Sequence, residues 1–479
     1  MRADLDRLFS AMGAHADGVS AAPPESVRRR GNQRRRNRIT FICATLVLLV
    51  GASAAMARAD LGRGTPPAAP TPRPTAAFTT LTPVGAGMSM PLGTSGVGMA
   101  SVSGNRLFVA GVTEQHRLLL GASDLSTGQP LWATVDIGQF DWPGLYVKGD
   151  AILVVGARQA GSNPVYVAMV VDAATGAKRW EVGATDLGVA VFDAVLAVRS
   201  TTEHAVLGLD WNTGAPRWRI PFADGEQPAI VQNMITPRAN GLSVGSWPDI
   251  ADQRLYLIQT DGTVRTYLGS TGAPVSTLAN SAPRTTGTDS PGYAVYDNVL
   301  YAVGRTNEFW VADLGGATST SSLTYTAPSG SSIRSLTPCG VSQVCLITKT
   351  ATNVELIAVD RATHAVLWRR AAPLAEHAAA MADRILTDRG QLYDMGGHPL
   401  GDDAALDAFW VTPGSALIIR RADFTDIHSD LSVIGVSTVD GAETILGRIP
   451  QVRGICTRTA ELLVCPTDDG FHVWRYARG

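Results

Sequence analysis

The sequence lacks the motifs by which most enzymes are recognised. Among its 479 residues there is no Gly-x-Ser-x-Gly elbow, no phosphate-binding loop and no His-Glu-x-x-His zinc motif. The eight histidines are scattered, and no two cysteines are adjacent. The doublets Asp402-Asp403 and Asp468-Asp469 fall in predicted loops, where turn chemistry explains them better than calcium binding does. We therefore predict no catalytic, cofactor-binding or metal-binding residue.

Charged residues are also scarce, at 17%, and they are unevenly distributed. Residues 1–38 contain nine Arg and four Asp or Glu, a net charge of +5, whereas the rest of the chain carries 31 Lys or Arg against 38 Asp or Glu, a net charge of −7. Seven of the arginines precede an apolar run, namely Arg28, Arg29, Arg30, Arg34, Arg35, Arg36 and Arg38. Such a cluster is attracted to anionic lipid headgroups by about 1 kcal/mol per residue. No aromatic platform accompanies it, so nucleic-acid binding is not predicted.

The apolar run itself, residues 39–57, is long enough to cross a membrane. It has 19 uncharged residues, which span about 28 Å as a helix. Because positive residues stay on the cytoplasmic side, we expect a single transmembrane helix with its N-terminus inside the cell. The competing interpretation is a signal peptide cleaved after Ala55-Met56-Ala57. The long leader and the long apolar run favour the retained anchor, and in both cases the remaining chain leaves the cytoplasm.

Four closely related segments show that this part of the chain is built from repeats. They are DLSTGQPLW, DAATGAKRW, DWNTGAPRW and DRATHAVLW, and each follows a short run of β-forming residues. Asp caps the turn, Gly takes a positive φ at low cost, and Trp offers a large apolar surface to a neighbouring sheet. The structural repeat residues are Asp124, Gly128 and Trp132; Asp172, Gly176 and Trp180; Asp210, Gly214 and Trp218; and Asp360 and Trp368.

The spacing of the repeats indicates the architecture. Weaker copies begin at Leu268, Asp313, Asp394 and Asp440, and the mean spacing of all copies is near 45 residues. That period fits one four-stranded propeller blade. The segment 454–476 looks like a last three-stranded piece, which the stretch Thr82–Pro91 would close. The sequence thus predicts an all-β fold, a β-propeller of about eight four-stranded blades, with seven or nine as alternatives, preceded by one transmembrane helix.

The repeat unit resembles that of the pyrroloquinoline-quinone-like (PQQ-like) β-propeller superfamily. The D-x-x-T-G-x-x-x-W pattern, preceded by runs such as VYVAMVV and ELIAV, carries the resemblance over roughly Pro83–Tyr476. That superfamily joins quinone-dependent alcohol dehydrogenases to non-enzymatic propellers, such as the lipoprotein scaffold of the outer-membrane β-barrel assembly machine. The dehydrogenases carry an adjacent Cys-Cys disulfide over the cofactor, which is missing here. The resemblance therefore implies the non-enzymatic branch, without a cofactor.

The chain divides into four parts. We assign a cytoplasmic Arg-rich segment to residues 1–38, the transmembrane helix to 39–57, a Pro/Thr/Ala-rich linker to 58–82 and the extracytoplasmic propeller to 83–479. Leu5, Leu8, Phe9 and Met12 have helical spacing, so residues 1–20 are a candidate contact for a cytoplasmic protein. This layout resembles actinobacterial membrane proteins that are thought to work beside sigma factors.

Four cysteines of the predicted propeller form two local pairs. Cys339 and Cys345 bracket one hairpin-like connection, and Cys456 and Cys465 bracket another. Outside the cytoplasm such pairs oxidise, so we expect the disulfides Cys339–Cys345 and Cys456–Cys465 in preference to the crossed pairings. A zinc site is the rival interpretation, but the spacings fit no common zinc motif.

Together these features predict a non-catalytic binding or scaffold propeller tethered to the cell membrane, with an envelope protein or wall component as its partner. A transmembrane sensor that acts on a cytoplasmic regulator, such as a sigma-factor system, is the first alternative, and a quinone-dependent dehydrogenase-like enzyme is the second. Residues 222–252 are the candidate binding rim. Trp142, Trp247 and Trp310, which lie outside the repeat position, are the candidate ligand-contacting aromatics.

Overall fold

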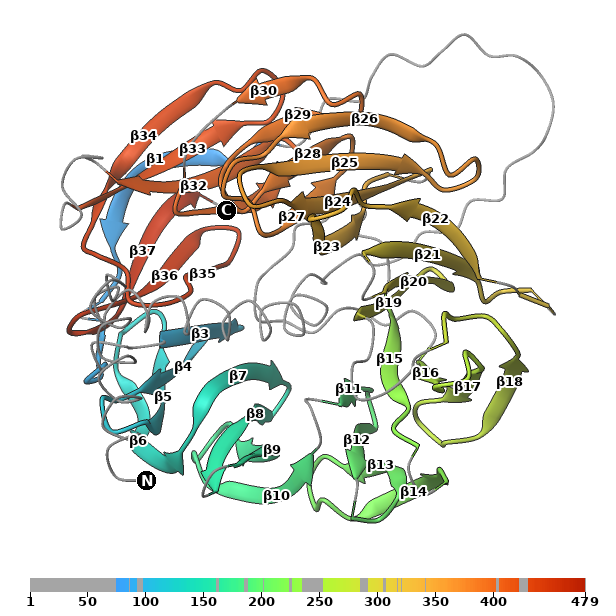
Figure 1. Cartoon of the computed structure of the whole chain (residues 1–479). Helices are drawn as coiled ribbons and strands as arrows, with labels where there is room; N and C mark the ends of the chain where they lie inside the picture. Colours follow the sequence, from blue (N-terminus) through green and yellow to red (C-terminus); the bar gives the residue numbers. More distant parts are fainter. Residues whose placement is uncertain are drawn as a thin grey trace, which may run out of the picture. The chain divides into compact units, whose positions relative to one another are not determined.

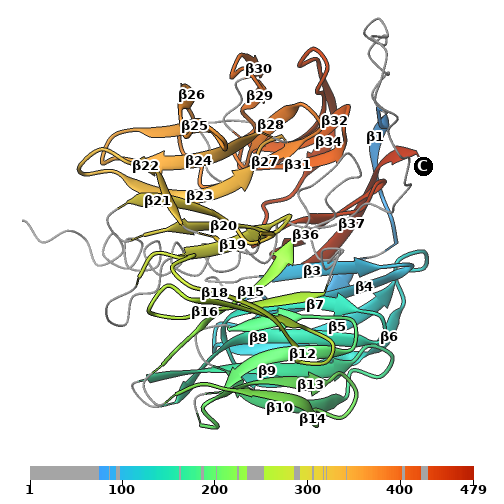
Figure 2. The same ribbon diagram turned by 90° about the vertical axis from the view of Figure 1, so that its right-hand side faces the viewer.

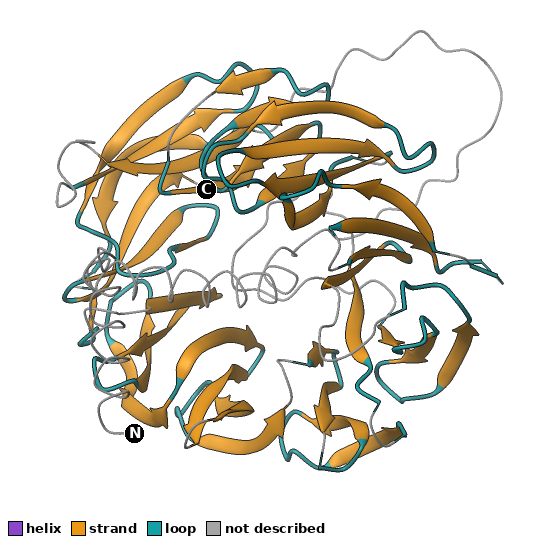
Figure 3. Cartoon of the chain, in the orientation of Figure 1, coloured by secondary structure: helices purple, strands orange, loops and turns teal. Residues whose placement is uncertain are grey.

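The structure is a computed structural model of the 479-residue chain. It describes residues 75–478, except 86, 93–97, 161–162, 185–187, 201, 224–225, 235–252, 285–291, 305–306, 317, 320, 341, 402–404 and 422–429. All regular elements in this part are strands (Figure 3). No helix among these residues has the length and apolarity needed to cross a membrane. The predicted segments 1–38 and 39–57, and most of the predicted linker, lie outside the described residues.

The strands form nine four-stranded antiparallel blades in chain order (Figure 1). Blades 1 to 3 are β3 (Gly98–Ser103), β4 (Arg106–Val112), β5 (Arg117–Asp124) and β6 (Pro130–Gln139); β7 (Asp141–Lys148), β8 (Ala151–Ala160), β9 (Asn163–Asp172) and β10 (Lys178–Ala184); β11 (Val189–Val191), β12 (Val195–Ser200), β13 (Ala205–Asp210) and β14 (Pro216–Pro221). Blades 4 and 5 are β15 (Ala229–Met234), β16 (Arg254–Ile258), β17 (Val264–Leu268) and β18 (Pro274–Leu278); β19 (Gly292–Tyr296), β20 (Val299–Val303), β21 (Glu308–Asp313) and β22 (Ser322–Thr326).

Blades 6 to 8 are β23 (Ser332–Pro338), β24 (Gln343–Lys349), β25 (Val354–Asp360) and β26 (Val366–Ala371); β27 (Ala378–Met381), β28 (Arg384–Thr387), β29 (Leu392–Asp394) and β30 (Pro399–Gly401); β31 (Asp407–Thr412), β32 (Ser415–Arg421), β33 (Leu431–Ser437) and β34 (Glu443–Ile449). Blade 9 combines β35 (Thr457–Arg458), β36 (Leu462–Thr467) and β37 (Gly470–Arg478) with β1 (Ala77–Pro83) from the start of the described chain.

The central strands are apolar on both faces because each blade packs between two others. In β12 all six residues are buried, and its side chains contribute to two different hydrophobic clusters: Leu196 and Val198 to one, Val195 and Ala197 to the other. A strand covered on both sides reads as a continuous apolar run and not as an alternating one.

The repeat tryptophans join consecutive blades. Trp180 of blade 2 donates its indole N–H to the carbonyl of Trp211 in blade 3, at 3.0 Å. Its ring also covers Gly214, where an added Cβ would lie 2.7 Å from the ring and where φ is +69°. Equivalent ring-on-glycine contacts are Trp132 on Gly176, Trp218 on Gly272 and Trp368 on Gly397. The glycine of each such repeat thus serves the turn and makes room for the tryptophan of the preceding blade.

The repeat aspartates hold the turns that present these glycines. The carboxylate of Asp172 accepts hydrogen bonds from the backbone N–H groups of Ala174 and Thr175, at 3.0 and 2.9 Å. The Arg179 guanidinium and then the Thr175 hydroxyl are the main causes that lower the pKa of Asp172 to about 2. The turn is therefore stabilised by an ionised carboxylate over the whole physiological pH range.

The predicted number of about eight blades is wrong, because the blades number nine. The eight repeat turns lie between the third and fourth strands of blades 1 to 8. In blade 9 the fourth strand is β1, from the other end of the described chain, so its third and fourth strands, β37 and β1, are not joined by such a turn. The number of repeat turns therefore predicts eight blades and misses blade 9, which β1 completes.

The fourth strand of blade 9 also begins earlier than the sequence predicts. β1 pairs with β37 from Ala77↔Arg478 to Pro83↔Trp474, and both views show the two strands side by side (Figures 1 and 2). The predicted closing stretch, Thr82–Pro91, contributes only the end of β1 and the two-residue strand β2 (Met88–Ser89), which also pairs with β37. The stretch assigned to the linker, 58–82, therefore contains most of β1, because Ala and Thr residues that suit a linker also suit an edge strand.

Candidate functional site

A cluster of ionisable side chains lies where blades 7 and 8 begin. Three segments meet there: the loop 372–377 that leads into β27, the turn 388–391 between β28 and β29, and residues 405–407 at the start of β31. In a propeller, connections at the ends of the innermost strands are exposed at one face of the ring, where such proteins bind ligands. These three segments form the candidate site.

Arg389 connects the loop 372–377 with residues 405–407 through hydrogen bonds. Its Nε donates to the carbonyl of Leu374 at 3.2 Å, and its Nη1 donates to the carbonyl of Leu406 at 3.1 Å. The backbone N–H of Ala405 in turn donates to the carbonyl of Arg389 at 3.0 Å. A planar guanidinium with donors on two edges suits this bridging role. Arg389 therefore fixes the positions of Leu374 and Leu406.

Asp388 and Gln391, in the turn between β28 and β29, also form hydrogen bonds with the loop 372–377. The Asp388 carboxylate accepts hydrogen bonds from the backbone N–H groups of Glu376 and His377, at 3.0 and 3.1 Å. Gln391 donates from its side-chain amide to the carbonyl of Pro373 at 3.3 Å. The Nζ of Lys349, in blade 6, donates to the Oε1 of Glu376 at 3.2 Å. The loop is thus fixed at four positions, 373, 374, 376 and 377.

The loop presents an apolar side chain in an unfavourable backbone conformation. Leu374 is 70% exposed and has a φ of +64°, and Leu406 beside it is 39% exposed. A positive φ in a leucine costs on the order of 1–2 kcal/mol, and such strain is concentrated at functional sites. Because the side chain of Leu374 is largely in solvent, the hydrogen bonds that hold the loop offset this cost, and burial of the side chain does not.

Replacing Leu374 by Gly is expected to stabilise the protein. Glycine adopts a positive φ without the steric cost, so we expect the free energy of unfolding to rise by about 0.5 to 1 kcal/mol despite the more flexible unfolded chain. Chemical denaturation followed by fluorescence measures this change. Leu374→Ala is the control, since it removes the exposed side chain but keeps the strain. A Gly variant no more stable than the Ala variant would show that the backbone is not strained there.

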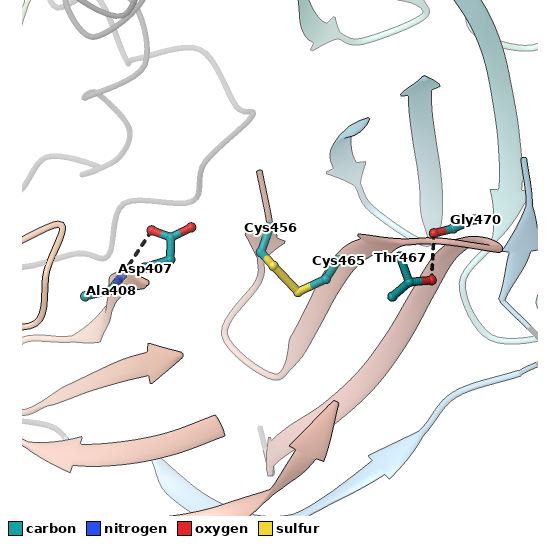
Figure 4. Close-up of a disulfide and its surroundings, with 6 residues drawn as sticks. All are labelled: Asp407, Ala408, Cys456, Cys465, Thr467 and Gly470. Carbon is teal, nitrogen blue, oxygen red and sulfur yellow. Dashed lines mark hydrogen bonds between the residues drawn. A yellow bond between two sulfur atoms is a disulfide. The ribbon is translucent and has the colours of Figure 1, made fainter. Parts of the chain in front are cut away.

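Two acids and a histidine of these three segments have shifted pKa values. Loss of hydration and then the nearby Asp388 carboxylate raise the pKa of Asp407 to about 8. Burial also raises the pKa of Asp388 and lowers that of His377. Asp407 accepts one hydrogen bond among the described residues, from the N–H of Ala408 at 3.0 Å (Figure 4). Both ring nitrogens of His377 are buried and have no hydrogen-bond partner in the described part of the chain.

Stability should depend on pH through Asp407. Its pKa in the folded protein, about 8, lies above the value near 3.9 in the unfolded chain. Protonated Asp407 therefore favours folding, and this contribution is lost as the pH rises from about 4 to 8. In Asp407→Asn the free energy of unfolding should decline less with rising pH. At pH 8 this variant should be more stable than the parent by about 2 kcal/mol, a value that allows for the partial exposure of the side chain. Urea titrations at pH 5 and pH 8 measure this, and equal declines in both proteins would contradict it.

The other predicted site residues are dispersed. The predicted disulfides are confirmed: Cys339 is joined to Cys345 in blade 6, and Cys456 to Cys465 in blade 9 (Figure 4), with all four cysteines buried. Figure 4 also shows Thr467 donating to the carbonyl of Gly470, at 3.1 Å. The repeat tryptophans lie at blade junctions, and the histidines 364, 398 and 472 lie in or beside turns. These residues serve the fold and form no common site.

The candidate binding rim and its aromatics do not form a site in the described residues. Residues 229–234 of the predicted rim form β15, the innermost strand of blade 4. Residues 235–252, which include Trp247, lie outside the described residues, as do Asp402 and Asp403. Trp142 lies in β7, and Trp310 lies in β21, half-buried against the cluster between blades 4 and 5. The prediction that 222–252 forms an inserted rim is thus wrong for residues 229–234, because these residues form a strand of blade 4.

Little in the sequence indicates the site at blades 7 and 8. Pro373, Leu374 and Glu376 belong to no motif, and Asp407 lies 19 residues from Asp388. The only local signal is an apolar residue after proline in a loop rich in alanine. The shifted pKa values arise from burial and from contacts between blades, which a single sequence does not reveal.

Comparison with known proteins defines the family. The family model described as outer membrane protein assembly factor BamB matches residues 166–395, which run from β9 of blade 2 to just past β29 of blade 7. The chain is a PQQ-like β-propeller protein. None of the curated proteins matches its sequence.

Several solved structures are similar to this chain at low identity. BamB from Moraxella catarrhalis is 16% identical, with 84% of this chain and 99% of that chain covered and a TM-score of 0.42. A quinohemoprotein alcohol dehydrogenase, ADHIIG from Pseudomonas putida HK5, is 11% identical, with coverages of 84% and 76% and a TM-score of 0.39. A europium-containing methanol dehydrogenase is 11% identical, with coverages of 83% and 93% and a TM-score of 0.41.

The residues of this PQQ-like propeller do not fit the quinone centre of the dehydrogenases. Among the residues that the structure describes, no group of three or more His, Cys, Asp or Glu side chains is placed to hold a metal ion. The two disulfides join cysteines six and nine positions apart, so neither is the adjacent pair that those enzymes carry. We therefore derive no reaction through a quinone.

Proposed function

We propose that this PQQ-like propeller is a non-catalytic binding scaffold that lies outside the cytoplasm, is tethered to the cell membrane by residues 39–57, and binds an envelope protein. The observation that carries the proposal is the surface at blades 7 and 8. There, Arg389 and Asp388 hold a strained, exposed leucine in place through hydrogen bonds to the backbone. A preorganised apolar surface of this kind suits recognition of a protein.

Two further observations support the location and the absence of chemistry. The buried disulfides in blades 6 and 9 suit an oxidising compartment. The matching family model is named for an assembly factor, which is a role in binding. The His377, Asp388 and Asp407 side chains carry shifted pKa values, yet the part of the chain that the structure describes offers them no metal site.

A transmembrane sensor is the second candidate. The helical spacing of Leu5, Leu8, Phe9 and Met12 and the Arg-rich segment before the apolar run favour a contact of residues 1–20 with a cytoplasmic regulator. In such a protein, binding at the propeller would be communicated through residues 39–57. Removal of residues 1–20 would then abolish signalling and leave partner binding intact.

The test compares proteins that copurify with two forms of the chain. The full chain and a form lacking residues 1–38 are purified in mild detergent, and bound proteins are identified by mass spectrometry. A scaffold retains the same envelope proteins in both forms. A cytoplasmic protein lost with residues 1–38 would support the sensor, and the absence of any specific partner from both forms would contradict both proposals.

A further inference from the structure

The surface at blades 7 and 8 combines apolar and acidic features that restrict what it can bind. We define the leucine–aspartate surface as Leu374, Leu406, Asp388 and Asp407, with His377 beneath it. Leu374 and Leu406 are fixed by the same guanidinium, that of Arg389. Their side chains are 70% and 39% exposed, so a partner that covers both would bury apolar area worth about 25 cal/mol per Å².

The carboxyl groups at this surface outnumber the cations. Asp388, Asp407 and Glu376 provide three carboxyl groups, and Lys349 and Arg389 provide two cations. Lys349 is engaged by Glu376 at 3.2 Å, and Arg389 donates to two carbonyls besides lying 3.8 Å from Asp388. For Asp407 the described residues supply one backbone N–H and no cation within salt-bridge distance. Asp407 is mostly protonated near pH 7 in the free protein, and a cation from outside would favour its ionised form and pair with it.

His377 adds an independent indication of a missing partner. Both its nitrogens are buried without a hydrogen bond in the described part of the chain, although such groups are almost always satisfied in folded proteins. The neutral imidazole has one donor and one acceptor. The Asp388 carboxylate accepts a hydrogen bond from the backbone N–H of His377 at 3.1 Å and also interacts electrostatically with its imidazole, so the imidazole belongs to the same cluster as the acids.

Building on the proposed function, we propose that the leucine–aspartate surface binds a protein segment in which a lysine or arginine lies between apolar side chains. The basic group contacts Asp407, and the apolar side chains cover Leu374 and Leu406. An anionic partner is disfavoured, because the two cations of the cluster are already engaged. A polysaccharide lacks both the apolar side chains and the cation, so a wall polymer does not fit this surface.

The test uses photo-crosslinking from position 374 in intact cells. The variant Leu374→p-benzoylphenylalanine is made in the full chain, and a matched probe replaces Ile445, which is 69% exposed on the fourth strand of blade 8. We expect the probe at 374 to attach to a protein segment with a basic residue flanked by apolar residues. Adding Asp407→Lys should reduce the yield at least tenfold, and Asp193→Asn, at an exposed acid in blade 3, should leave it unchanged.

Each result separates this inference from the scaffold proposal. A crosslinked segment without a basic residue, attachment to a glycan, or a yield within twofold in Asp407→Lys would overturn the inference. A protein captured only by the probe at 445 would also overturn it but would leave the scaffold proposal standing. If neither probe captures a protein and no partner copurifies with the parent, both fail. The Asp407→Lys variant must keep the thermal transition of the parent; if it does not, Leu406→Asp replaces it, with the same tenfold loss expected.

Discussion

Deletion of the closing strand β1 is expected to abolish the cooperative unfolding of the propeller. β1 supplies the fourth strand of blade 9 by pairing with β37. It also packs against blade 8, where the ring of Phe78 lies over Gly435 and the side chain of Leu81 lies over Gly447. Removing Ala77–Pro83 therefore exposes an edge of β37 and opens the contact between blades 8 and 9. The loss should be comparable to the whole stability of a domain, about 5 kcal/mol or more.

Urea denaturation of the deletion variant measures this effect. We expect a broad transition at low urea in place of a single steep one, together with rapid cleavage of blade 9 by added protease. Thr80→Ala is the matched control, because Thr80 is an exposed residue of the same strand and its replacement should cost less than about 0.5 kcal/mol. A deletion variant with the midpoint and slope of the parent would contradict the closure by β1.

The second large effect is expected for Trp180→Ala, with a loss of about 3–5 kcal/mol in the free energy of unfolding. The Trp180 side chain is 91% buried, since only 9% remains exposed. Its ring fills the space over Gly214, and its indole N–H satisfies the carbonyl of Trp211. The truncation leaves a cavity at a blade junction and an unsatisfied carbonyl. Gly214, on the other side of this cavity, has no side chain that could fill it.

Two further variants divide this loss into its parts. Trp180→Phe keeps most of the ring burial but removes the hydrogen bond, so we expect a loss of about 1–2 kcal/mol. Val275→Ala, at a site 47% exposed on the outer strand β18, should change stability by less than about 0.5 kcal/mol. Equal losses in Trp180→Ala and Val275→Ala would show that the tryptophan does not join blades 2 and 3.

The repeats predict the propeller because their chemistry is local. Asp172, Thr175 and Gly176 form their turn through contacts within five residues, so the pattern is visible in the sequence. The tryptophan at a fixed distance after the turn then indicates packing against the next blade. The disulfides were predictable for the same reason, since each joins two strands of one hairpin.

The blade number and the closing strand depend on contacts between the two ends of the chain. Ala77 pairs with Arg478, and no pattern within either end specifies that pairing. The edge strand β1 is composed of Ala, Phe, Thr, Leu and Pro, and three of its seven residues are Thr, so it resembles the preceding linker more than a buried strand. The repeat pattern therefore predicts the structure of one blade more reliably than it predicts which strands close the ring.

The candidate site could not be predicted for a related reason. Leu374, Asp388 and Asp407 come from three segments separated by 14 and 19 residues, and the fold of blades 7 and 8 brings them together. The strain at Leu374 is a property of the backbone, and the pKa of Asp407 depends on its burial beside Asp388. Neither leaves a signature in residue type or spacing.

Native mass spectrometry of the full chain, purified in mild detergent from the membranes in which it is made, tests the central claim most directly. The scaffold account predicts a complex whose mass exceeds that of the chain by a protein, and a released chain with the mass of the polypeptide alone and two disulfides. A chain that is isolated without a protein partner but retains a bound metal ion or quinone would contradict the account and support an enzyme.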